Sequence, residues 1–255
     1  MRGKVLLLRR GTLLLILTAL VAAGIFMAVG GPSFVSASAA KRQLPIYSVE
    51  REEKVCAISF DAAWGNEDTQ ALIDILGKYN VKATFFVVGD WVDKYPESVK
   101  ALHDAGHEVM NHSLHHDHYN ALTADQVVAD VTACNEKIAA ITGVTPCLIR
   151  CPYGEYDDHV ISAIRSMGME PIQWDVDSLD WKDYDADTIC QRVTSKLSPG
   201  SIVLFHNAAL HTPEALPAIL DHMAREGYSL LPISQLIYRE NYTICLLYTS
   251  PSPRD

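Results

Sequence analysis

Four of the ten histidines in the chain lie within seven residues, in the stretch 111–118. They are His112, His115, His116 and His118. His112 and His116 are four residues apart, so on a helical turn both imidazoles would lie on one face and could hold a divalent metal ion. A histidine-rich stretch can equally be a solvated polar loop. The pattern alone leaves both interpretations open.

The segments that must position these histidines alternate regularly after residue 53. Short apolar runs typical of strands cover 55–60, 82–88, 107–111, 146–150, 170–175, 201–205 and 228–232. Segments with helical spacing cover 67–79, 96–105, 123–141, 157–167, 185–196 and 213–225. Seven β/α units in series predict an α/β fold with a parallel sheet, most economically closed into a barrel.

The ends of these predicted segments carry the expected signals. Four glycines follow predicted helix ends, where a left-handed residue is favoured: Gly106, Gly143, Gly168 and Gly227. Thr123 and Asp185 are suitable N-caps for the helices that follow them. These capping residues therefore agree with the predicted alternation of strands and helices.

In a β/α barrel the functional residues lie where strands end and loops begin. Five predicted strand ends carry titratable groups: Asp61, the pair His112 and His116, Arg150, the pair Asp177 and Asp180, and His206. Any one of them could be a solvated loop residue. A purely structural barrel would not need five strands that deliver such groups to one rim.

Five motifs in this order resemble those of the polysaccharide deacetylases with a NodB homology domain, carbohydrate esterase family 4. They are Ser59-Phe60-Asp61, His112-Ser113-Leu114-His115-His116, Arg150-Cys151-Pro152-Tyr153-Gly154, Asp180-Trp181 and Leu204-Phe205-His206. The resemblance covers roughly residues 55–232. It implies a distorted (β/α) barrel of about seven parallel strands that removes acetyl groups from N-acetylated sugars with a divalent metal.

The resemblance also implies roles for individual residues. His112 and His116 match metal ligands, and the metal would activate a water and polarise the carbonyl. Asp61 matches the general base and Arg150 the arginine that orients it. The implied metal is zinc, with cobalt, nickel or manganese as alternatives. For Arg150, a structural salt bridge and the functional role overlap.

The remaining matches concern the leaving group and the acetyl pocket. His206 matches the general acid and Asp180 the carboxylate that holds it. Tyr153 resembles the residue whose backbone N–H helps to form an oxyanion hole. Trp181 and Leu204 would wall the pocket for the acetyl methyl group, although both could equally be ordinary core residues.

The sequence departs from the family at one ligand. Members usually have two adjacent aspartates in the first motif, the second being a metal ligand, but Ala62 follows Asp61 here. Either Asp68 or Glu67 replaces it from the following loop, or two histidines and waters hold the metal, or metal binding is weak. Asp68 is the preferred substitute, and its alternative role is a charge at a helix N-terminus. Further candidates are His115, Asp117 and His118, whereas His211 is expected to open a helix.

Residues 1–40 form a candidate export signal or N-terminal membrane anchor. Their charged groups are all basic (Arg2, Lys4, Arg9 and Arg10), and an apolar run of about 21 residues follows, with Ala37-Ser38-Ala39 as a cleavage-type sequence. The rest of the chain carries 17 basic against 31 acidic groups, a net charge of −14. Such a charge repels phosphate backbones, which argues against nucleic acid as a partner.

The other boundaries follow from composition. Residues 41–53 read as a linker, 54–242 as the deacetylase domain, and 243–255 as a disordered or non-native-looking tail without periodicity. The six cysteines show no disulfide framework and no C-x-x-C pair, so they are predicted to be mainly packing residues.

Together these features predict a metal-dependent N-deacetylase of cell-envelope glycan, with peptidoglycan N-acetylhexosamine as the expected substrate. The protein would be secreted or anchored to the membrane, and its first motif resembles that of sporulation-associated members. The alternative is a glycan-binding or morphogenetic protein that kept the fold without a complete metal site. A barrel glycosidase would need two carboxylates flanking a sugar bond, which the histidines fit poorly.

Overall fold

We describe a computed structural model of the chain, which covers residues 11–12, 14–15, 17–21 and 42–244. The chain divides into two units, Met1–Lys41 and Arg42–Asp255, and only the second holds the sheet. None of the helices in the described part combines the length and apolar character needed to cross a bilayer. The predicted signal or anchor lies largely outside the described residues, as does the tail from residue 245.

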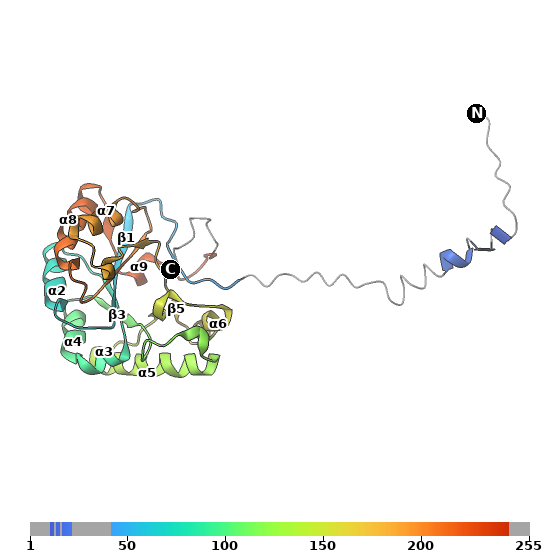
Figure 1. The fold of residues 1–255 in the computed structure, drawn as a ribbon, viewed down its shortest axis with the longest axis horizontal. Helices are drawn as coiled ribbons and strands as arrows, with labels where there is room; N and C mark the ends of the chain where they lie inside the picture. Colours follow the sequence, from blue (N-terminus) through green and yellow to red (C-terminus); the bar gives the residue numbers. More distant parts are fainter. Residues whose placement is uncertain (1–10, 13, 16, 22–41, 245–255) are drawn as a thin grey trace, which may run out of the picture. The chain divides into compact units, whose positions relative to one another are not determined.

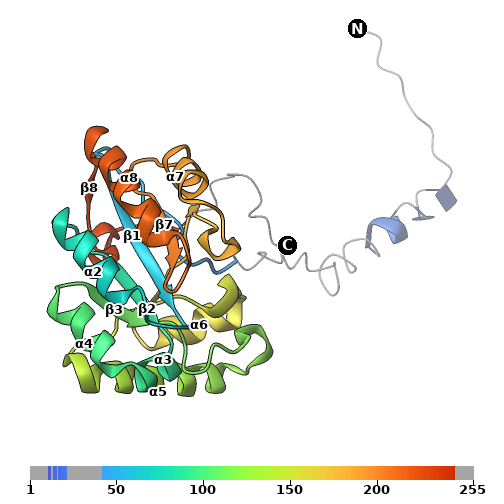
Figure 2. The ribbon, with the colours of Figure 1, turned by 60° about the vertical axis from the view of Figure 1, so that its left-hand side comes forward.

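The second unit is built on one parallel sheet, seen in Figures 1 and 2. Its strands run in the order β5-β4-β3-β2-β1-β7-β6, and β8 pairs with the first residues of β1. Their bounds are β1 (Val55–Ala62), β2 (Thr84–Val87), β3 (Glu108–Asn111), β4 (Leu148–Ile149), β5 (Glu170–Pro171), β6 (Val176–Asp177), β7 (Ile202–His206) and β8 (Ser229–Leu230). Every strand pairing is parallel, so the carboxyl ends share one edge. The predicted distorted α/β barrel is confirmed.

Helices pack around the outside of this sheet (Figure 1), except α9, which buries Ile233 and Leu236 against Ala57 and Phe86 on its other face. They are α2 (Thr69–Lys78), α3 (Gly89–Lys94), α4 (Pro96–Asp104), α5 (Ala124–Thr142), α6 (Asp158–Ser166), α7 (Ala186–Thr194), α8 (Thr212–Arg225) and α9 (Ile233–Leu236). Thr123 caps α5 in a capping box and Asp185 caps α7, as predicted. Gly143 ends α5 in the left-handed conformation, with a φ of 73°. His211 directly precedes α8.

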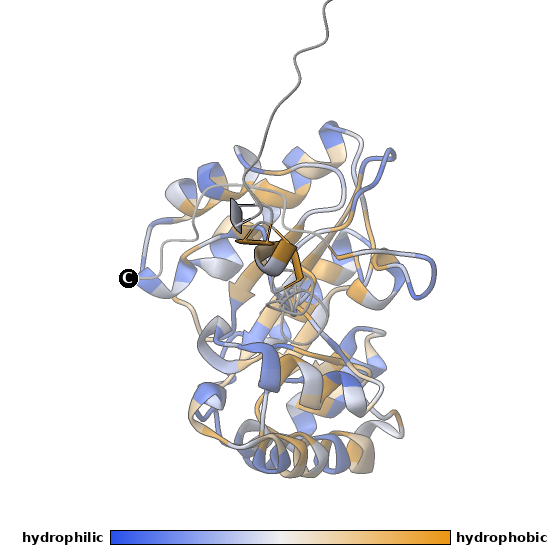
Figure 3. Cartoon of the chain, turned by 90° about the vertical axis from the view of Figure 1, so that its right-hand side faces the viewer, coloured by the Kyte–Doolittle hydropathy of each residue, from blue (hydrophilic) through white to orange (hydrophobic). Residues whose placement is uncertain are grey.

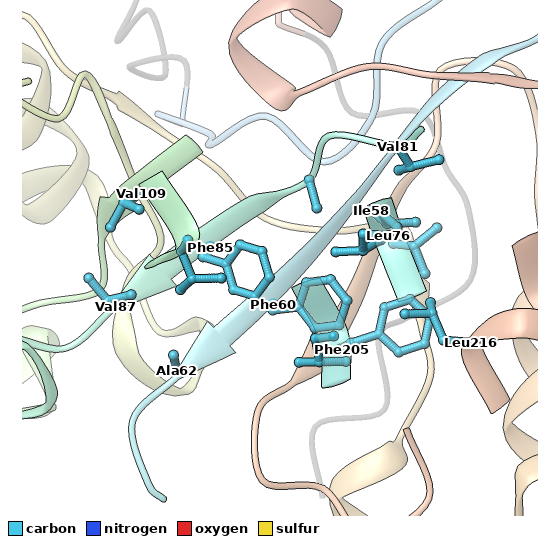
Figure 4. Packing of buried hydrophobic residues seen from close by; sticks show 14 of the residues in the cluster. Ile58, Phe60, Ala62, Leu76, Val81, Phe85, Val87, Val109, Phe205 and Leu216 are labelled. Carbon is cyan, nitrogen blue, oxygen red and sulfur yellow. The ribbon is translucent and has the colours of Figure 1, made fainter. Parts of the chain in front are cut away.

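The core lies where β1 faces the outer helices. The Phe60 ring stacks on Phe85, with centroids 4.8 Å apart, and on Phe205, 5.4 Å apart. Figure 4 shows Phe60 between these two rings, with Leu216 beside Phe205. In Figure 3 the helices alternate between hydrophobic and hydrophilic colours, as expected of elements with one buried face. This packing fixes β1, the strand that carries Asp61.

The sheet differs from the sequence prediction at residues 170–175. This run was expected to be one strand, but β5 pairs with β4 at one end of the sheet and β6 with β7 at the other. The chain crosses between the two edges in residues 172–175. Local sequence pattern cannot reveal that the two ends of such a segment pair with different strands.

An N-terminal strap, residues 42–50, packs against the edge strand β5 and against the residues at the start of β7. Ile46 N donates a hydrogen bond to Pro171 O (2.9 Å), and Gln173 N donates to Ile46 O (2.7 Å). Val49 N donates to Gly200 O (3.0 Å), and Ile46 and Val49 are buried. Much of the segment expected to be a linker is thus an ordered part of the domain, for reasons of long-range hydrogen bonding that composition does not reveal.

The five described cysteines are all free, and Cys56, Cys134 and Cys151 are buried. Burial raises the pKa of each of these three thiols to about 12, which keeps them uncharged at neutral pH. They pack as predicted.

The core makes a first prediction. Phe60→Ala should lower the free energy of unfolding by about 3–5 kcal/mol, because it removes a fully buried ring and leaves a cavity. Leu210→Ala, at a side chain that is 70% exposed, should change it by less than about 0.5 kcal/mol. Chemical denaturation measures both, and similar losses for the two variants would contradict the packing described here.

Candidate active site

A buried ion pair joins the ends of β1 and β4. Arg150 Nη1 donates a hydrogen bond to Asp61 Oδ1 at 2.7 Å, and Nη2 donates to Ser59 Oγ at 2.9 Å. Arg150 is fully buried and Asp61 is 6% exposed. Burial would raise the pKa of Asp61, but Arg150 foremost, then His112 and His206, hold it below its usual range. The carboxyl group therefore stays ionised at neutral pH, with Oδ2 left for other partners.

His112 lies against that second oxygen. Its Nδ1 bonds to the carbonyl oxygen of Arg150 at 2.7 Å, which requires Nδ1 to carry the proton. Nε2 then keeps its lone pair, and it lies 3.6 Å from Asp61 Oδ2. Burial lowers the pKa of His112, so the imidazole is neutral at neutral pH.

His116 stands beside it, with ring centroids 5.0 Å apart at 67°. Burial, followed by the neighbouring His112, lowers the pKa of His116 to about 4. Its Nδ1 is buried and has no hydrogen-bond partner among the described residues. The structure therefore brings together two neutral imidazoles, the form in which histidine binds metal.

The loop that carries both histidines is docked on the start of α3. Gly89 N donates to Ser113 O at 2.9 Å and Asp90 N to Leu114 O at 3.0 Å. A β-carbon at Gly89 would lie 3.1 Å from Leu114 O and 3.2 Å from Leu114 Cα. Ser113 Oγ in turn accepts a hydrogen bond from His116 N at 2.9 Å. Glycine is needed because the loop approaches the helix so closely.

Helix α5 holds the same loop through polar side chains. Asp130 Oδ1 accepts hydrogen bonds from Leu114 N at 2.9 Å and from the Tyr119 hydroxyl at 2.5 Å. Asn111 Nδ2 donates to Asn135 Oδ1 at 2.8 Å. Sequence reasoning missed these supports because they lie 11 to 24 residues from the residues they hold and carry no motif of their own.

A second charged pair joins the ends of β6 and β7. The fully buried Asp180 accepts hydrogen bonds from His206 Nδ1 (2.8 Å), His206 N (2.8 Å) and Thr212 Oγ1 (2.6 Å). Burial alone would lower the pKa of His206, but the hydrogen bond and charge of Asp180 outweigh it and raise that pKa. Nε2 is the nitrogen that remains for a substrate, and the His206 side chain is partly exposed.

Tyr153, after β4, has a left-handed backbone with a φ of 58°. Its ring stacks on His118, with centroids 4.2 Å apart and planes 13° apart, and meets the His116 ring edge-on at 4.5 Å. His118 Nδ1 is 3.0 Å from Glu155 Oε2. A left-handed backbone conformation raises the free energy of a non-glycine residue by about 1–3 kcal/mol, so contacts with its neighbours must hold Tyr153 in place.

The two predicted pocket residues differ in exposure. Trp181 is 53% exposed, whereas Leu204 in β7 is 3% exposed and pairs with Ser59 of β1. Asp177 accepts a hydrogen bond from Leu179 N at 2.9 Å and lies at the end of β6.

Asp68, the predicted third ligand, contacts the loop after β7. Its Oδ2 accepts a hydrogen bond from Ala208 N at 2.9 Å, while Oδ1 is buried without a partner among the described residues. Burial, with Glu67 and Asp180 as lesser causes, raises the pKa of Asp68. Within residues 42–244 no group of three or more histidine, cysteine, aspartate or glutamate side chains is arranged to hold a metal. The third ligand stays a prediction.

Comparison with known proteins identifies the group to which this arrangement belongs. The family model of polysaccharide deacetylases matches residues 48–172. The peptidoglycan-N-acetylmuramic acid deacetylase PdaA of Bacillus subtilis is 30% identical over 198 residues, which are 76% of this chain and 75% of PdaA. The chain belongs to the polysaccharide deacetylase family. The resemblance seen in the five sequence motifs is confirmed.

Two other similar proteins show how varied the relatives of this chain are. The uncharacterised protein YlxY of Bacillus subtilis is 32% identical over 193 residues, 76% of this chain, and this chain spans 60% of its length. The solved structure of BA3943 from Bacillus anthracis, a CE4 family pseudoenzyme, has a TM-score of 0.73 and 35% identity, covering 76% of this chain and 68% of BA3943. A mutant of BA3943 is described as having restored enzymatic activity. The family therefore includes active and inactive proteins.

The donor atoms partly fit the divalent metal that this family implies. The lone pair of His112 Nε2 and the unpartnered nitrogen of His116 are ligands of the right kind. The sequence signal that found them was their spacing.

The loop with the missing aspartate is held by two residues that sequence reasoning did not select. Trp91 Nε1 and Asn207 Nδ2 each donate hydrogen bonds to the carbonyl oxygens of Trp64 and Gly65. Only the position of Asn207, directly after His206, could have suggested a role.

The docking of the histidine loop on α3 predicts the effect of Gly89→Ala. The new β-carbon would lie 2.7 Å from Leu114 Cδ1, so the loop must move. We expect faster amide hydrogen exchange in residues 111–118, because the hydrogen bonds from Gly89 N and Asp90 N that dock the loop would be weakened or lost.

Gly77→Ala is the matched control, since nothing lies within 4 Å of a β-carbon at that site in α2. It should leave exchange in the loop unchanged and add about 0.5–1 kcal/mol to the free energy of unfolding. Equal exchange in the two variants would refute the proposed support of the loop.

Proposed function

We propose that the chain is a metal-dependent N-deacetylase that acts on cell-envelope glycan, with peptidoglycan N-acetylhexosamine as its substrate. One observation carries the proposal: Asp61 Oδ2 is turned toward His112 Nε2 at 3.6 Å, while Arg150 occupies Oδ1. An ionised carboxylate beside a neutral metal-binding imidazole is what activation of a water requires. The substrate follows from PdaA, which is named as a peptidoglycan deacetylase.

His112 and His116 would hold the divalent metal, zinc in the first instance, with cobalt, nickel or manganese as alternatives. When bound, the metal polarises the acetamide carbonyl and lowers the pKa of a water. Asp68 is the proposed third protein ligand, through Oδ1, which has no partner among the described residues while Oδ2 accepts from Ala208 N; otherwise waters complete the shell.

Asp61 is the proposed general base. Its free Oδ2 takes a proton from the attacking water, and Arg150 favours the ionised form that can do so. Because His112 is neutral at neutral pH, the permanent charge of Arg150 is the main influence that keeps this carboxylate ionised.

The remaining roles concern the products, acetate and a free amine. The backbone N–H of Tyr153 stabilises the oxyanion, a contribution of about 3 kcal/mol for one donor. His206 donates a proton to the leaving nitrogen from Nε2, because Asp180 holds Nδ1. Trp181 and Leu204 enclose the acetyl methyl group.

Action on peptidoglycan places the domain outside the cytoplasm. We accordingly propose that residues 1–40 are a cleaved signal or a membrane anchor, that 54–242 hold the deacetylase activity, and that 243–255 take no part in it. Membership of a sporulation-associated branch belongs to the same proposal. Because the chain spans 60% of YlxY, these assignments concern the shared domain.

A second candidate function is a glycan-binding or morphogenetic protein without activity. Two observations favour it: Ala62 stands where the family usually has a metal-binding aspartate, and BA3943, at 35% identity, is a pseudoenzyme. The two candidates share the fold and the substrate but differ in metal content.

The deciding experiment measures bound metal and acetate release from N-acetylated peptidoglycan for the purified protein and three variants. His112→Ala should lose metal and activity together. Asp61→Asn should keep the metal and lose about 10²- to 10⁴-fold in rate, since a general base contributes that much. Asp68→Ala should weaken metal binding if it is the third ligand, and unchanged metal content and rate would remove it from the site.

The parent protein gives the decisive control. No bound metal and no acetate with added zinc, cobalt, nickel or manganese would reject the deacetylase proposal in favour of the binding protein.

The pairing of His206 with Asp180 predicts a pH dependence. A general acid must be protonated, so activity falls as pH rises through the pKa of His206, which Asp180 raises. Asp180→Asn removes that charge and lowers the pKa, so the alkaline limb of the pH–rate profile should move to lower pH. Asp187→Asn, at an exposed position in α7, should leave the limb in place. Coincident limbs for Asp180→Asn and the parent would rule out this role.

A further inference from the structure

Trp64 is an unusual residue in the loop after β1, because its side chain is 70% exposed. A single exposed apolar side chain needs no explanation on its own. Here, however, the exposed ring belongs to a backbone that buried side chains hold in place. An exposed ring on a fixed backbone is suited to bind a ligand.

Five hydrogen bonds fix this backbone. Trp91 Nε1 donates to Trp64 O at 2.9 Å and to Gly65 O at 2.6 Å. Asn207 Nδ2 donates to the same two oxygens at 2.8 and 2.7 Å, and Asn207 Oδ1 accepts from Ala63 N at 3.3 Å. Trp91 and Asn207 are 2% and 5% exposed. The indole therefore projects from an anchored loop, and little conformational entropy remains to be lost when a ligand packs on it.

The ring also lies next to the histidine pair. Its centroid is 6.0 Å from that of His116, with the planes at 64°, and His116 is 5.0 Å from His112. The His116 ring also contacts the ring of Tyr153, with centroids 4.5 Å apart. Trp64 thus stands one ring away from the proposed position of the acetamide, too far to enclose the acetyl group but adjacent to whatever continues from it.

We propose that Trp64 stacks on the pyranose ring of the sugar next to the one that is deacetylated. A pyranose presents a face of C–H groups, and an exposed, rigid indole offers a large apolar surface of matching flatness. The ligand class is thus a chain of at least two N-acetylhexosamine units. This inference rests on the proposed function for the place of the acetamide, but stacking itself requires only that glycan binds.

The test compares Trp64→Ala and Trp64→Phe with the parent, on N-acetylglucosamine and on its β-1,4-linked tetramer. Calorimetry gives the affinity for the tetramer, and acetate release gives KM and kcat for both sugars. Trp64→Ala should weaken tetramer binding by about 3- to 10-fold, in line with an aromatic contact, and raise KM for the tetramer without lowering kcat. Trp64→Phe should restore most of the affinity.

Two controls keep the result specific. Val144→Ala, an exposed apolar residue after α5, should bind the tetramer as the parent does. For the parent and Trp64→Ala, values for the monosaccharide should agree, because it has no second ring. Both Trp64 variants keep the backbone carbonyl groups that Trp91 and Asn207 bind, and thermal unfolding verifies that they fold.

Failure of this inference differs from failure of the proposed function. Tetramer affinity unchanged in Trp64→Ala, or equal losses on monosaccharide and tetramer, overturns the stacking role. A parent that binds the tetramer but releases no acetate from peptidoglycan rejects the enzyme, while loss of affinity in Trp64→Ala would still support the subsite.

Discussion

The buried pair of Arg150 and Asp61 is the interaction on which the site depends. Arg150 ties together β1, through Asp61 and Ser59, and the segment after β5, through Gln173 O at 3.2 Å. Its guanidinium also lies over the Phe86 ring, 4.3 Å from the centroid. Removal of one partner of such a pair leaves an uncompensated buried charge, at a cost of about 3–5 kcal/mol. The same contact thus stabilises the sheet and sets the ionisation of the candidate base, so function and stability are not separable at this position.

Backbone strain gathers at the same edge of the sheet. Among the described residues, six non-glycine residues with positive φ lie in loops that follow β3, β4, β6 and β7: Ser113, His116, Tyr153, Leu179, Asp183 and Ala208. These loops must turn sharply to aim side chains inward, and such conformations persist only when the surroundings hold them. The hydrogen bonds from Gly89, Asp90 and Asp130 supply that hold for the histidine loop. The packed domain thus stabilises the strained loops at the carboxyl edge of the sheet.

The sequence predicted the parts that depend on local pattern. Apolar runs located the inner strands, and Thr123 and Asp185 located helix starts, because caps and periodicity are local properties. Helix α3 was missed since six residues are too few for a helical period to emerge. The crossing at residues 172–175 was missed because it depends on which strands pair.

The site divides in the same way. Order and spacing of the motifs located Asp61, Arg150, Asp180 and His206, whose contacts with one another the structure now describes. The metal shell could not be completed from sequence, because a substitute ligand depends on the path of a loop. Asp68 illustrates this, since a hydrogen bond from Ala208 N turns one of its oxygens toward the loop after β7.

The strap of residues 42–50 bears on where this domain begins. The family match starts at residue 48, inside the strap, and a domain boundary at residue 54 would leave the whole strap out. Without Ile46, the backbone groups of Pro171 and Gln173 would lose their partners, and a strand edge would face solvent. Gly200, where a β-carbon would fall 1.6 Å from Val49 O, is shaped to this one segment. A shortened domain would therefore keep every motif residue yet expose an edge on which other chains could add strands, and self-association would follow from a cut made far from the chemistry.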